Sequence, residues 1–381
     1  MSGFFSDYDF VENAIEQEYR KAEKKKGFIN LTGSNPTHEG LIFPFEVLKN
    51  AAISYLSKRR YDPDPKGLYL ARQAVSDYYK NRMPSIKITT DNITITASTS
   101  ESYSTLFSLL ADPGDNILAP KITYPLFEHL AAIHHIELRP YGLDEKNNWQ
   151  INENSILSEY DSRTRAIIIV SPHNPTGSVI KESVAVLNKL GLPVICDEVF
   201  AEFSCMTANI PPFGSLHPDL TVFHLNGISK MFGLPDLKLG WIALSGPALK
   251  DFGKRIDLLN DTYLGANYMI QSMLPSIFSD GFAFVKQMQS HIRIGIDLAV
   301  ELLSKNPNIS VNRPDGGYYL FPEIKNWKDE EKVVLYLLKS KNVLVHPGYF
   351  YDCDKKVHIM ISCLTETKKL AEGIKRIIAA I

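Results

Sequence analysis

The sequence holds little cysteine, no long apolar run and no excess of either charge. Only four cysteines occur in 381 residues, and their spacing matches no metal-binding motif, so we expect reduced thiols, no metal site and a cytoplasmic protein. The formal net charge of -2 argues against the basic surface that nucleic-acid binding requires. No uninterrupted apolar run approaches the ~20 residues that span a bilayer, and the first residues lack the basic and then apolar order of a signal peptide. We therefore expect neither a nucleic-acid partner nor a membrane.

The middle of the chain alternates short apolar runs with longer helical stretches. This alternation predicts an α/β fold with a mostly parallel central sheet covered by helices on both faces. The expected strands are 92–98, 116–120, 136–141, 165–172, 193–199, 221–228 and 240–245. Ligands of such sheets bind at the carboxyl ends of the strands, so polar residues that follow these runs are candidates for a site.

The end of the chain has a different pattern. An amphipathic helix is expected over 284–305, strands around 317–321, 343–345 and 357–363, and a final helix with apolar residues at helical spacing. We therefore expect a three-layer α/β/α large domain over 46–283. A smaller α+β domain would be formed by the two termini, residues 1–45 and 284–381.

Lys230 follows the expected strand 221–228 in a stretch rich in serine and glycine. A lysine attacks an aldehyde only as the neutral amine, and it then forms a Schiff base. Taken alone, a loop lysine is more often a solvated surface residue. Its neighbours favour a site, because the hydroxyl of Ser229 and the cation of Lys238 both suit a phosphate group.

Two more polar residues follow apolar strands. Asp197 lies near the end of the run 193–199, where a carboxylate could pair with a protonated pyridine nitrogen, although a helix N-cap or a loop carboxylate is an alternative role. Asn174 lies in the tetrapeptide Asn-Pro-Thr-Gly after 165–172. Its amide could donate to a phenolate-like oxygen, although Asn-Pro is also a common turn.

Ser98, Thr99 and Ser100 lead from the strand 92–98 into a helix. Small hydroxyl residues there favour an anion site at the helix N-terminus, or simply an ordinary N-cap. Neither GxGxxG nor GxxxxGK occurs, which disfavours a dinucleotide or a nucleoside triphosphate. Tyr124, after the strand 116–120, could stack on a flat heterocycle or merely pack. Together these stretches provide a contact for every part of pyridoxal 5'-phosphate (PLP).

Short motifs occur in a fixed order along nearly the whole chain. They are Gly33 and Pro36, Tyr61 and Gly67, Pro113-Gly114-Asp115, Tyr124-Pro125, Asn174-Pro175-Thr176-Gly177, Asp197-Glu198-Val199, Ser229-Lys230, Gly240-Trp241, Gly316-Gly317 and Pro347-Gly348. In this order and spacing they resemble the fold type I PLP enzymes, specifically the class I/II aminotransferases typified by aspartate aminotransferase.

The resemblance implies a role for each candidate residue. Lys230 would carry PLP as a Schiff base and serve as acid and base in the proton transfer, and Asp197 would pair with the pyridine nitrogen. The remaining contacts would come from Ser98, Thr99, Ser100, Ser229 and Lys238 to the phosphate, Tyr124 to the ring and Asn174 to the ring oxygen. Gly33, Asn174 and His358 are the candidate substrate contacts. Tyr61 would contact the phosphate in the neighbouring subunit, which implies a homodimer with shared active sites.

Three positions depart from the family pattern. Lys238 and Met360 stand where the family usually has arginine, and Phe200 stands where it usually has tyrosine. The arginine expected at Met360 would hold the substrate α-carboxylate, and no arginine occurs from 352 to 369. Three explanations remain: another cation does this work, such as His358, Lys356 or Arg313; the substrate lacks a conventional α-carboxylate; or the enzyme is weak or specialised.

We therefore expect a PLP-dependent aminotransferase that moves an amino group from an amino acid or related amine to a 2-oxo acid. The mechanism would be ping-pong, through a pyridoxamine form. One alternative is a PLP-dependent C–S lyase or decarboxylase on the same fold. Another is a non-catalytic cofactor-binding regulator, but the segment before residue 30 is too short for the DNA-binding module that it would need.

Overall fold

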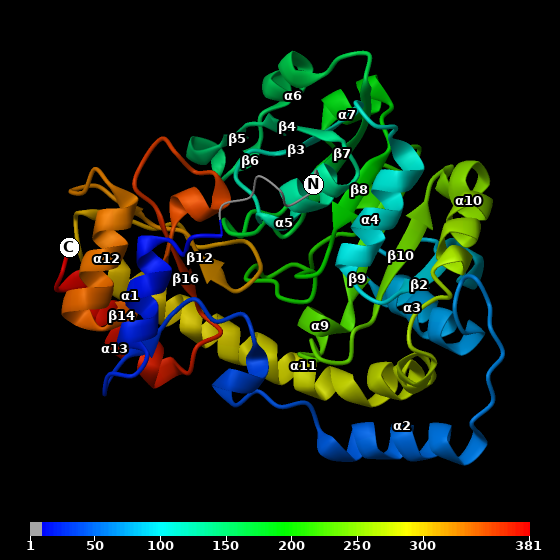
Figure 1. Ribbon diagram of the computed structural model, residues 1–381, viewed down its shortest axis with the longest axis horizontal. Coiled ribbons are helices and arrows are strands. Elements are labelled where there is room, and N and C mark those ends of the chain that lie inside the picture. The colour runs from blue at the N-terminus through cyan, green and yellow to red at the C-terminus, as the bar shows by residue number, and fades with distance from the viewer. Residues whose placement is uncertain (1–9) are drawn as a thin grey trace.

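The computed structural model describes residues 10–381, and its centre is a seven-stranded sheet (Figure 1). In spatial order the strands are β2 (Ile93–Thr96), β10 (Gly240–Ser245), β9 (Val222–Gly227), β8 (Val194–Asp197), β7 (Thr164–Val170), β3 (Asn116–Pro120) and β4 (Glu137–Tyr141). β10 runs antiparallel to both of its neighbours, and the other neighbouring strands are parallel. The mostly parallel sheet is therefore confirmed, with each expected strand within a few residues of its expected bounds.

Helices cover both faces of this sheet because alternate residues of its buried strands point in opposite directions. Ile168 and Phe223 face one layer, and Ile167 and Val222 face the other. The first layer contains α4 (Thr99–Leu110), α5 (Leu126–Ile133) and α10 (Ala248–Thr262); the second contains α6 (Glu153–Glu159), α7 (Ala185–Leu190) and the short α8 (Phe213–Leu216). The three-layer α/β/α arrangement is confirmed.

The two ends of the chain pack together beside this unit. β1 (Ile29–Asn30) pairs in parallel with β14 (Val343–Leu344), and α1 (Ala14–Ala22) packs on α12 (Glu330–Lys341). A small antiparallel sheet follows the order β12 (Tyr319–Leu320), β16 (Ile359–Ser362), β15 (His346–Pro347), while β11 (Ile309–Ser310) pairs with β13 (Glu323–Ile324). The final helix is α13 (Thr367–Ile378). Residues near both termini thus share one α+β unit.

One long helix joins the two units. α11 runs from Tyr268 to Leu303, contacts α3 (Tyr69–Asn81) at one end of its path, and contacts α13 at the other (Figure 1). The expected helix 284–305 is therefore only the second half of a longer one. The expected domain boundary at residue 284 falls inside this continuous helix, where no loop separates the units.

The helix α2 (Phe45–Lys58) lies along α11 on the outer side of the molecule (Figure 1). Large apolar side chains remain exposed on and near it, among them Phe45, Ile53, Leu56 and Tyr61. A group of exposed apolar side chains of this kind is typical of a protein–protein interface.

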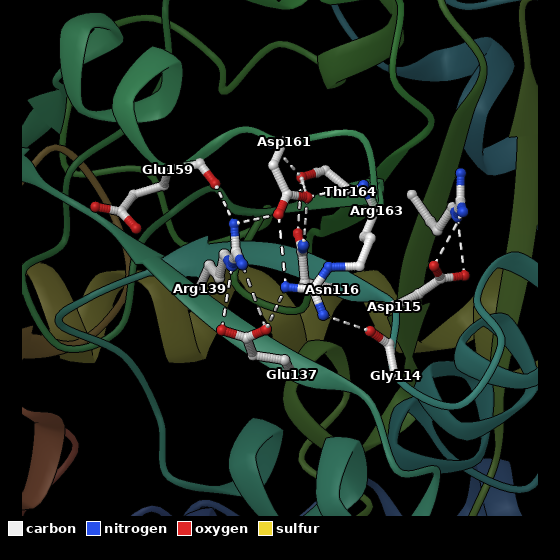
Figure 2. Close-up of polar contacts among 10 residues, drawn as sticks. Gly114, Asp115, Asn116, Glu137, Arg139, Glu159, Asp161, Arg163 and Thr164 are labelled. Carbon is white, nitrogen blue, oxygen red and sulfur yellow. Dashed lines mark hydrogen bonds and ion pairs between the residues drawn. The ribbon is translucent and has the colours of Figure 1, made fainter.

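A polar network holds the amino ends of β3, β4 and β7 together (Figure 2). Asp161 accepts from Asn116 Nδ2 at 2.8 Å and lies 2.8 Å from Arg139 Nη1, and Thr164 Oγ1 donates to Asn116 Oδ1 at 2.7 Å. The bond from Asn116 and the nearby guanidinium groups outweigh partial burial and lower the pKa of Asp161 to about 2. This network stabilises the edge of the sheet opposite the carboxyl ends of the strands.

No helix among residues 10–381 is long and apolar enough to cross a membrane.

Candidate active site

Most of the residues expected to bind one cofactor lie at or just after strand ends at one edge of the large sheet. Asp197 is the last residue of β8, Asn174 follows β7, Tyr124 follows β3, Ser98 follows β2, and Lys230 lies in α9 (Ile228–Met231) after β9. These five strands run in the same direction, since β2 and β9 are both antiparallel to β10. Their carboxyl ends therefore meet at one edge, and the structure brings the expected residues together there.

Asp197 is a buried carboxylate with two protein donors. Its Oδ1 accepts from Val199 N at 3.0 Å, and its Oδ2 accepts from the hydroxyl of Tyr103 at 3.0 Å. Burial raises the pKa of Asp197 to about 6, while these two donors and Lys230 oppose the rise. A buried carboxylate of this kind is suited to a cationic partner, which would restore its ordinary ionisation.

Lys230 lies largely out of water on the short helix α9. Burial lowers the pKa of its amine, Asp197 opposes that change, and the charge of Lys238 adds to it. A lowered pKa increases the fraction of neutral amine at neutral pH, and the neutral amine is the nucleophile that Schiff-base formation requires.

The N-terminus of α4 stays accessible because glycine lies opposite it. A Cβ at Gly240 would lie 3.0 Å from Ser98 C and 3.1 Å from Thr99 N, so any side chain there would cover the first turn of the helix. Ser98 is the N-cap, and its hydroxyl accepts from Glu101 N at 3.1 Å. Thr99 and Ser100 carry first-turn N–H groups, which have no acceptor within the helix and suit a phosphate.

The side chain of Asn174 indicates that a ligand fits among Asp197, Lys230 and the N-terminus of α4. Its Oδ1 is buried, and among the described residues it has no hydrogen-bond partner. Buried polar atoms are nearly always paired, so this oxygen marks a place where a further polar group belongs. A flat ligand with a phosphate, a ring oxygen, a basic ring nitrogen and an aldehyde fits the residues present. Half of the Tyr124 side chain is exposed, which leaves its ring free to contact such a ligand.

Tyr103 is a site residue that the sequence reasoning missed. It belongs to α4 and lies 94 residues before Asp197, so no local motif links the two. The helical spacing does contain a signal, because residues i and i+4 share one face and Tyr103 is four positions after Thr99.

Phe200 takes the place of the expected tyrosine inside an aromatic cluster. Its ring packs edge-on against Tyr318 at 4.9 Å and Tyr319 at 5.9 Å between centroids. Tyr319 and Tyr351 also lie within electrostatic reach of Tyr124, and the hydroxyl of Tyr351 lies 3.1 Å from His346 Nδ1. This side of the site therefore carries neutral hydroxyl and imidazole groups.

Each cation considered as a replacement for the missing arginine already faces a carboxylate. Lys356 Nζ lies 2.8 Å from Glu145 and 3.1 Å from Glu323, and Arg313 pairs with Asp297. His358 Nε2 lies 3.5 Å from Glu145, its ring stacks on Phe321 at 4.8 Å, and burial lowers its pKa. Met360 is buried in the core of the small sheet. These pairings leave none of the three cations without a counter-charge.

Three expected site residues, Gly33, Lys238 and Tyr61, make few contacts within the described chain that bear on their expected roles. The carbonyl of Gly33 accepts from Ser362 Oγ at 2.5 Å, which joins the N-terminal segment to β16. Lys238 is exposed and has a left-handed backbone (φ 52°). Tyr61 is two-thirds exposed, and its ring contacts only the edge of Tyr268, at 5.4 Å, among the ring pairs of the described chain.

A partly buried lysine, a buried carboxylate and a helix N-terminus at one sheet edge are the parts that a PLP-dependent enzyme needs, and the fold is that of aspartate aminotransferase. Solved structures support the fold: an aspartate aminotransferase mutant from Thermus thermophilus superposes with a TM-score of 0.85 at 19% identity, covering 100% of both chains.

Comparison with known proteins identifies the family. The family model "Aminotransferase class I and II" matches residues 26–377. The glutamate-pyruvate aminotransferase AlaA of Haemophilus influenzae is 27% identical over 97% of this chain and 94% of its own length. Alanine aminotransferase from Pyrococcus furiosus is 26% identical, with a TM-score of 0.90 over 100% of this chain and 98% of that one. The chain belongs to the class I and II aminotransferase family, and it is a PLP-dependent aminotransferase.

Proposed function

We propose that Lys230 is the residue to which PLP is covalently attached, as a Schiff base, and that the same amine moves the substrate proton. When bound, PLP supplies an aldehyde that combines with amines and a ring that accepts the electron pair of a broken Cα–H bond. Lys230 Nζ, as a neutral amine, would take the proton from the substrate Cα and would deliver it to the former aldehyde carbon of PLP, two bonds away. The lowered pKa of Lys230 supports this role.

Asp197 and Asn174 would hold the ring. Asp197 would keep a proton on the pyridine nitrogen, and this ion pair would return the carboxylate to its ionised form despite its burial. The amide of Asn174 would donate to the ring oxygen, and its buried, unpaired Oδ1 supports a polar ligand beside it. The unpaired Asn174 Oδ1, at the same sheet edge as the partly buried Lys230 and the buried Asp197, is the observation that carries the proposal.

The phosphate would lie at the N-terminus of α4. Thr99 and Ser100 offer N–H groups and hydroxyls, Ser98 shapes the turn as the N-cap, and Ser229 and Lys238 approach from the segment around Lys230. Tyr124 would stack on the ring, as its exposed side chain allows.

We also propose that the enzyme is a homodimer that shares its active sites. Tyr61 and the exposed apolar residues of α2 lie together, so burying α2 against a second copy would also bring Tyr61 to a partner surface. The four free, buried cysteines fit a reducing compartment, so we propose that the enzyme works in the cytoplasm.

The substrates would be an amino acid or related amine and a 2-oxo acid. The relatives named for alanine, glutamate-pyruvate and tyrosine aminotransfer make these amino acids the first candidates. Because Lys356, Arg313 and His358 already face carboxylates, we propose that neutral donors such as Tyr319 and Tyr351 contact the substrate carboxylate. We therefore expect KM for amino acids at or above the upper end of the usual ~1 μM–1 mM range.

An amine panel tests this function. The PLP-loaded protein is mixed with alanine, glutamate, tyrosine and a set of amines, and its visible absorption is followed while released 2-oxo acid is measured. Loss of the absorption with one oxo acid released per site supports transamination. Pyruvate and ammonia formed without any acceptor would indicate a lyase instead, and an unchanged spectrum with every amine would contradict the proposal.

Paired substrates test the carboxylate contact separately. Tyrosine and tyramine differ only in the α-carboxylate, so neutral recognition predicts kcat/KM values within about tenfold of each other, since a charged pair would contribute more. A discrimination above about a thousandfold would instead show a dedicated cation.

A further inference from the structure

Tyr103 connects the two polar ends of the candidate cofactor site. It lies in α4, whose first turn carries Ser98, Thr99 and Ser100, and its hydroxyl donates to Asp197 Oδ2 at 3.0 Å. The helix thus contacts both the expected phosphate position and the carboxylate expected beneath the ring.

The ring of Tyr103 is fixed by its neighbours. It is 1% exposed and packs against Phe127 at 4.8 Å and Phe107 at 6.1 Å between centroids. Burial and the charge of Asp197 raise the pKa of the Tyr103 hydroxyl, so it remains a protonated donor at every physiological pH. A rigid, permanent donor is suited to holding an acceptor in one orientation.

We propose that Tyr103 is a positioning residue that holds Asp197 ionised and aimed at the pyridine nitrogen of PLP. This inference rests on the role proposed for Asp197. A carboxylate without water loses its ionised form unless donors stabilise it, and Asp197 has only Tyr103 and the Val199 N–H as hydrogen-bond donors among the described residues.

The other titratable groups near Asp197 do not replace this donor. The charge of Glu198 raises the pKa of Asp197, and the thiol of Cys196 does not lower it. The amine of Lys230 would be bonded to the cofactor under the proposed function. Removing the Tyr103 hydroxyl therefore shifts Asp197 toward its neutral form, which cannot pair with a protonated ring nitrogen.

The test compares two ligands across three proteins. The ligands are PLP and its analogue with carbon in place of the ring nitrogen, and their dissociation constants are measured by titrating the apoprotein. Tyr103→Phe removes the donor, and Tyr141→Phe is the matched control, because the Tyr141 hydroxyl is equally buried but donates to Ile168 O at 2.9 Å. Wild type is expected to prefer PLP.

In Tyr103→Phe, we expect PLP affinity to fall about tenfold while affinity for the analogue stays unchanged, since only PLP uses the ion pair. Tyr141→Phe should keep the wild-type ratio. Equal losses for both ligands in Tyr103→Phe, or an unchanged ratio, would overturn the inference while leaving the role of Asp197 intact. A wild type that binds both ligands equally would refute the proposed role of Asp197 and the inference together.

A packing variant separates a positioning role from a structural one. Phe127→Leu loosens the ring of Tyr103 without removing its hydroxyl, and should lower the urea midpoint of the apoprotein more than Tyr103→Phe does. If its ligand ratio falls as far as that of Tyr103→Phe, the ratio reports packing and the inference fails. If the ratio is preserved, the hydroxyl itself is responsible.

Discussion

Arg82 Nη1 lies 2.8 Å from Glu198 Oε2, and both side chains are almost completely buried. Arg82 also donates to Ile210 O, while the carboxylate of Glu198 accepts from Phe213 N and faces His224 Nδ1 at 3.0 Å. Burial alone would raise the pKa of Glu198, but Arg82 and His224 outweigh it and lower that pKa to about 2. Glu198 immediately follows Asp197 in the chain, so this buried pair fixes the turn that carries Asp197.

Arg82→Met should therefore lower the free energy of unfolding by about 3–5 kcal/mol, because it leaves an unpaired charge in the interior. Urea unfolding of the apoprotein measures this change. Arg20→Met is the control, since Arg20 makes exposed pairs with Glu12 and Glu16 and should change the midpoint little. Equal changes in the free energy of unfolding for the two variants would show that the buried pair contributes no more than an exposed one.

Asp197→Asn should stabilise the cofactor-free protein above pH 6. The folded pKa of about 6 lies above the ordinary 3.8, so the folded state binds more protons between these values and wild-type stability falls as pH rises through that window. The full cost of ionising the buried carboxylate is about 3 kcal/mol, and the amide avoids it.

Urea unfolding of the apoprotein at pH 5 and pH 8 checks whether the stability advantage of Asp197→Asn grows as pH rises. The advantage of Asp197→Asn should be about half of its full value at pH 5 and near its full value at pH 8, while the same variant binds PLP poorly. A constant difference at both pH values would show that Asp197 does not titrate in this window.

Lys230→Arg should abolish covalent capture of PLP. After borohydride reduction of the wild-type holoprotein, peptide mass spectrometry should find the cofactor on residue 230, and the variant should release it. Transamination should fall by at least about a hundredfold, because the residue that moves the proton is lost.

Lys238→Arg serves as the matched control for this experiment. The guanidinium keeps the positive charge and can donate two parallel hydrogen bonds to a phosphate. Borohydride reduction at Lys230 should therefore proceed as in wild type, and PLP should bind at least as tightly. Label on another lysine in wild type would end the proposed role of Lys230.

Phe200→Tyr should lower the pKa of the absorption change of bound PLP, by on the order of one pH unit, because a phenol near the ring oxygen would stabilise its anionic form. Phe200 is buried, three residues after Asp197 in the chain. A spectrophotometric pH titration measures the change. Phe203→Tyr, which alters a neighbouring buried ring in contact with Tyr318, should leave the titration unchanged.

Ile53→Asp should convert the proposed dimer into monomers. Ile53 is 55% exposed on α2, and a charge at the centre of an apolar interface disfavours association. Sedimentation velocity measures the change in mass, and PLP affinity should fall with it because Tyr61 would no longer reach a neighbouring subunit. Ile294→Asp is the control, because Ile294 is also 55% exposed but lies on the part of α11 that packs near α13, next to Gly295. A wild-type monomer with full activity would refute the shared site.

The sequence by itself determined the large sheet and the positions of its polar residues. The strands were predictable because buried parallel strands are continuous apolar runs, and Asp197, Asn174 and Lys230 were recognisable because each follows such a run. Both signals are local, since a few neighbouring residues decide each strand and its end.

Only the tertiary structure decided which distant residues meet. Tyr103 contacts Asp197 across 94 residues, and Arg82 contacts Glu198 across 116 residues. Glu145 faces both Lys356 and His358, which the sequence offered as replacements for the missing arginine. The sequence reasoning also placed the start of the long helix at residue 284, whereas α11 begins at Tyr268. Local patterns set elements, but the pairing of buried charges depends on where whole elements cross, and that is a property of the packed chain alone.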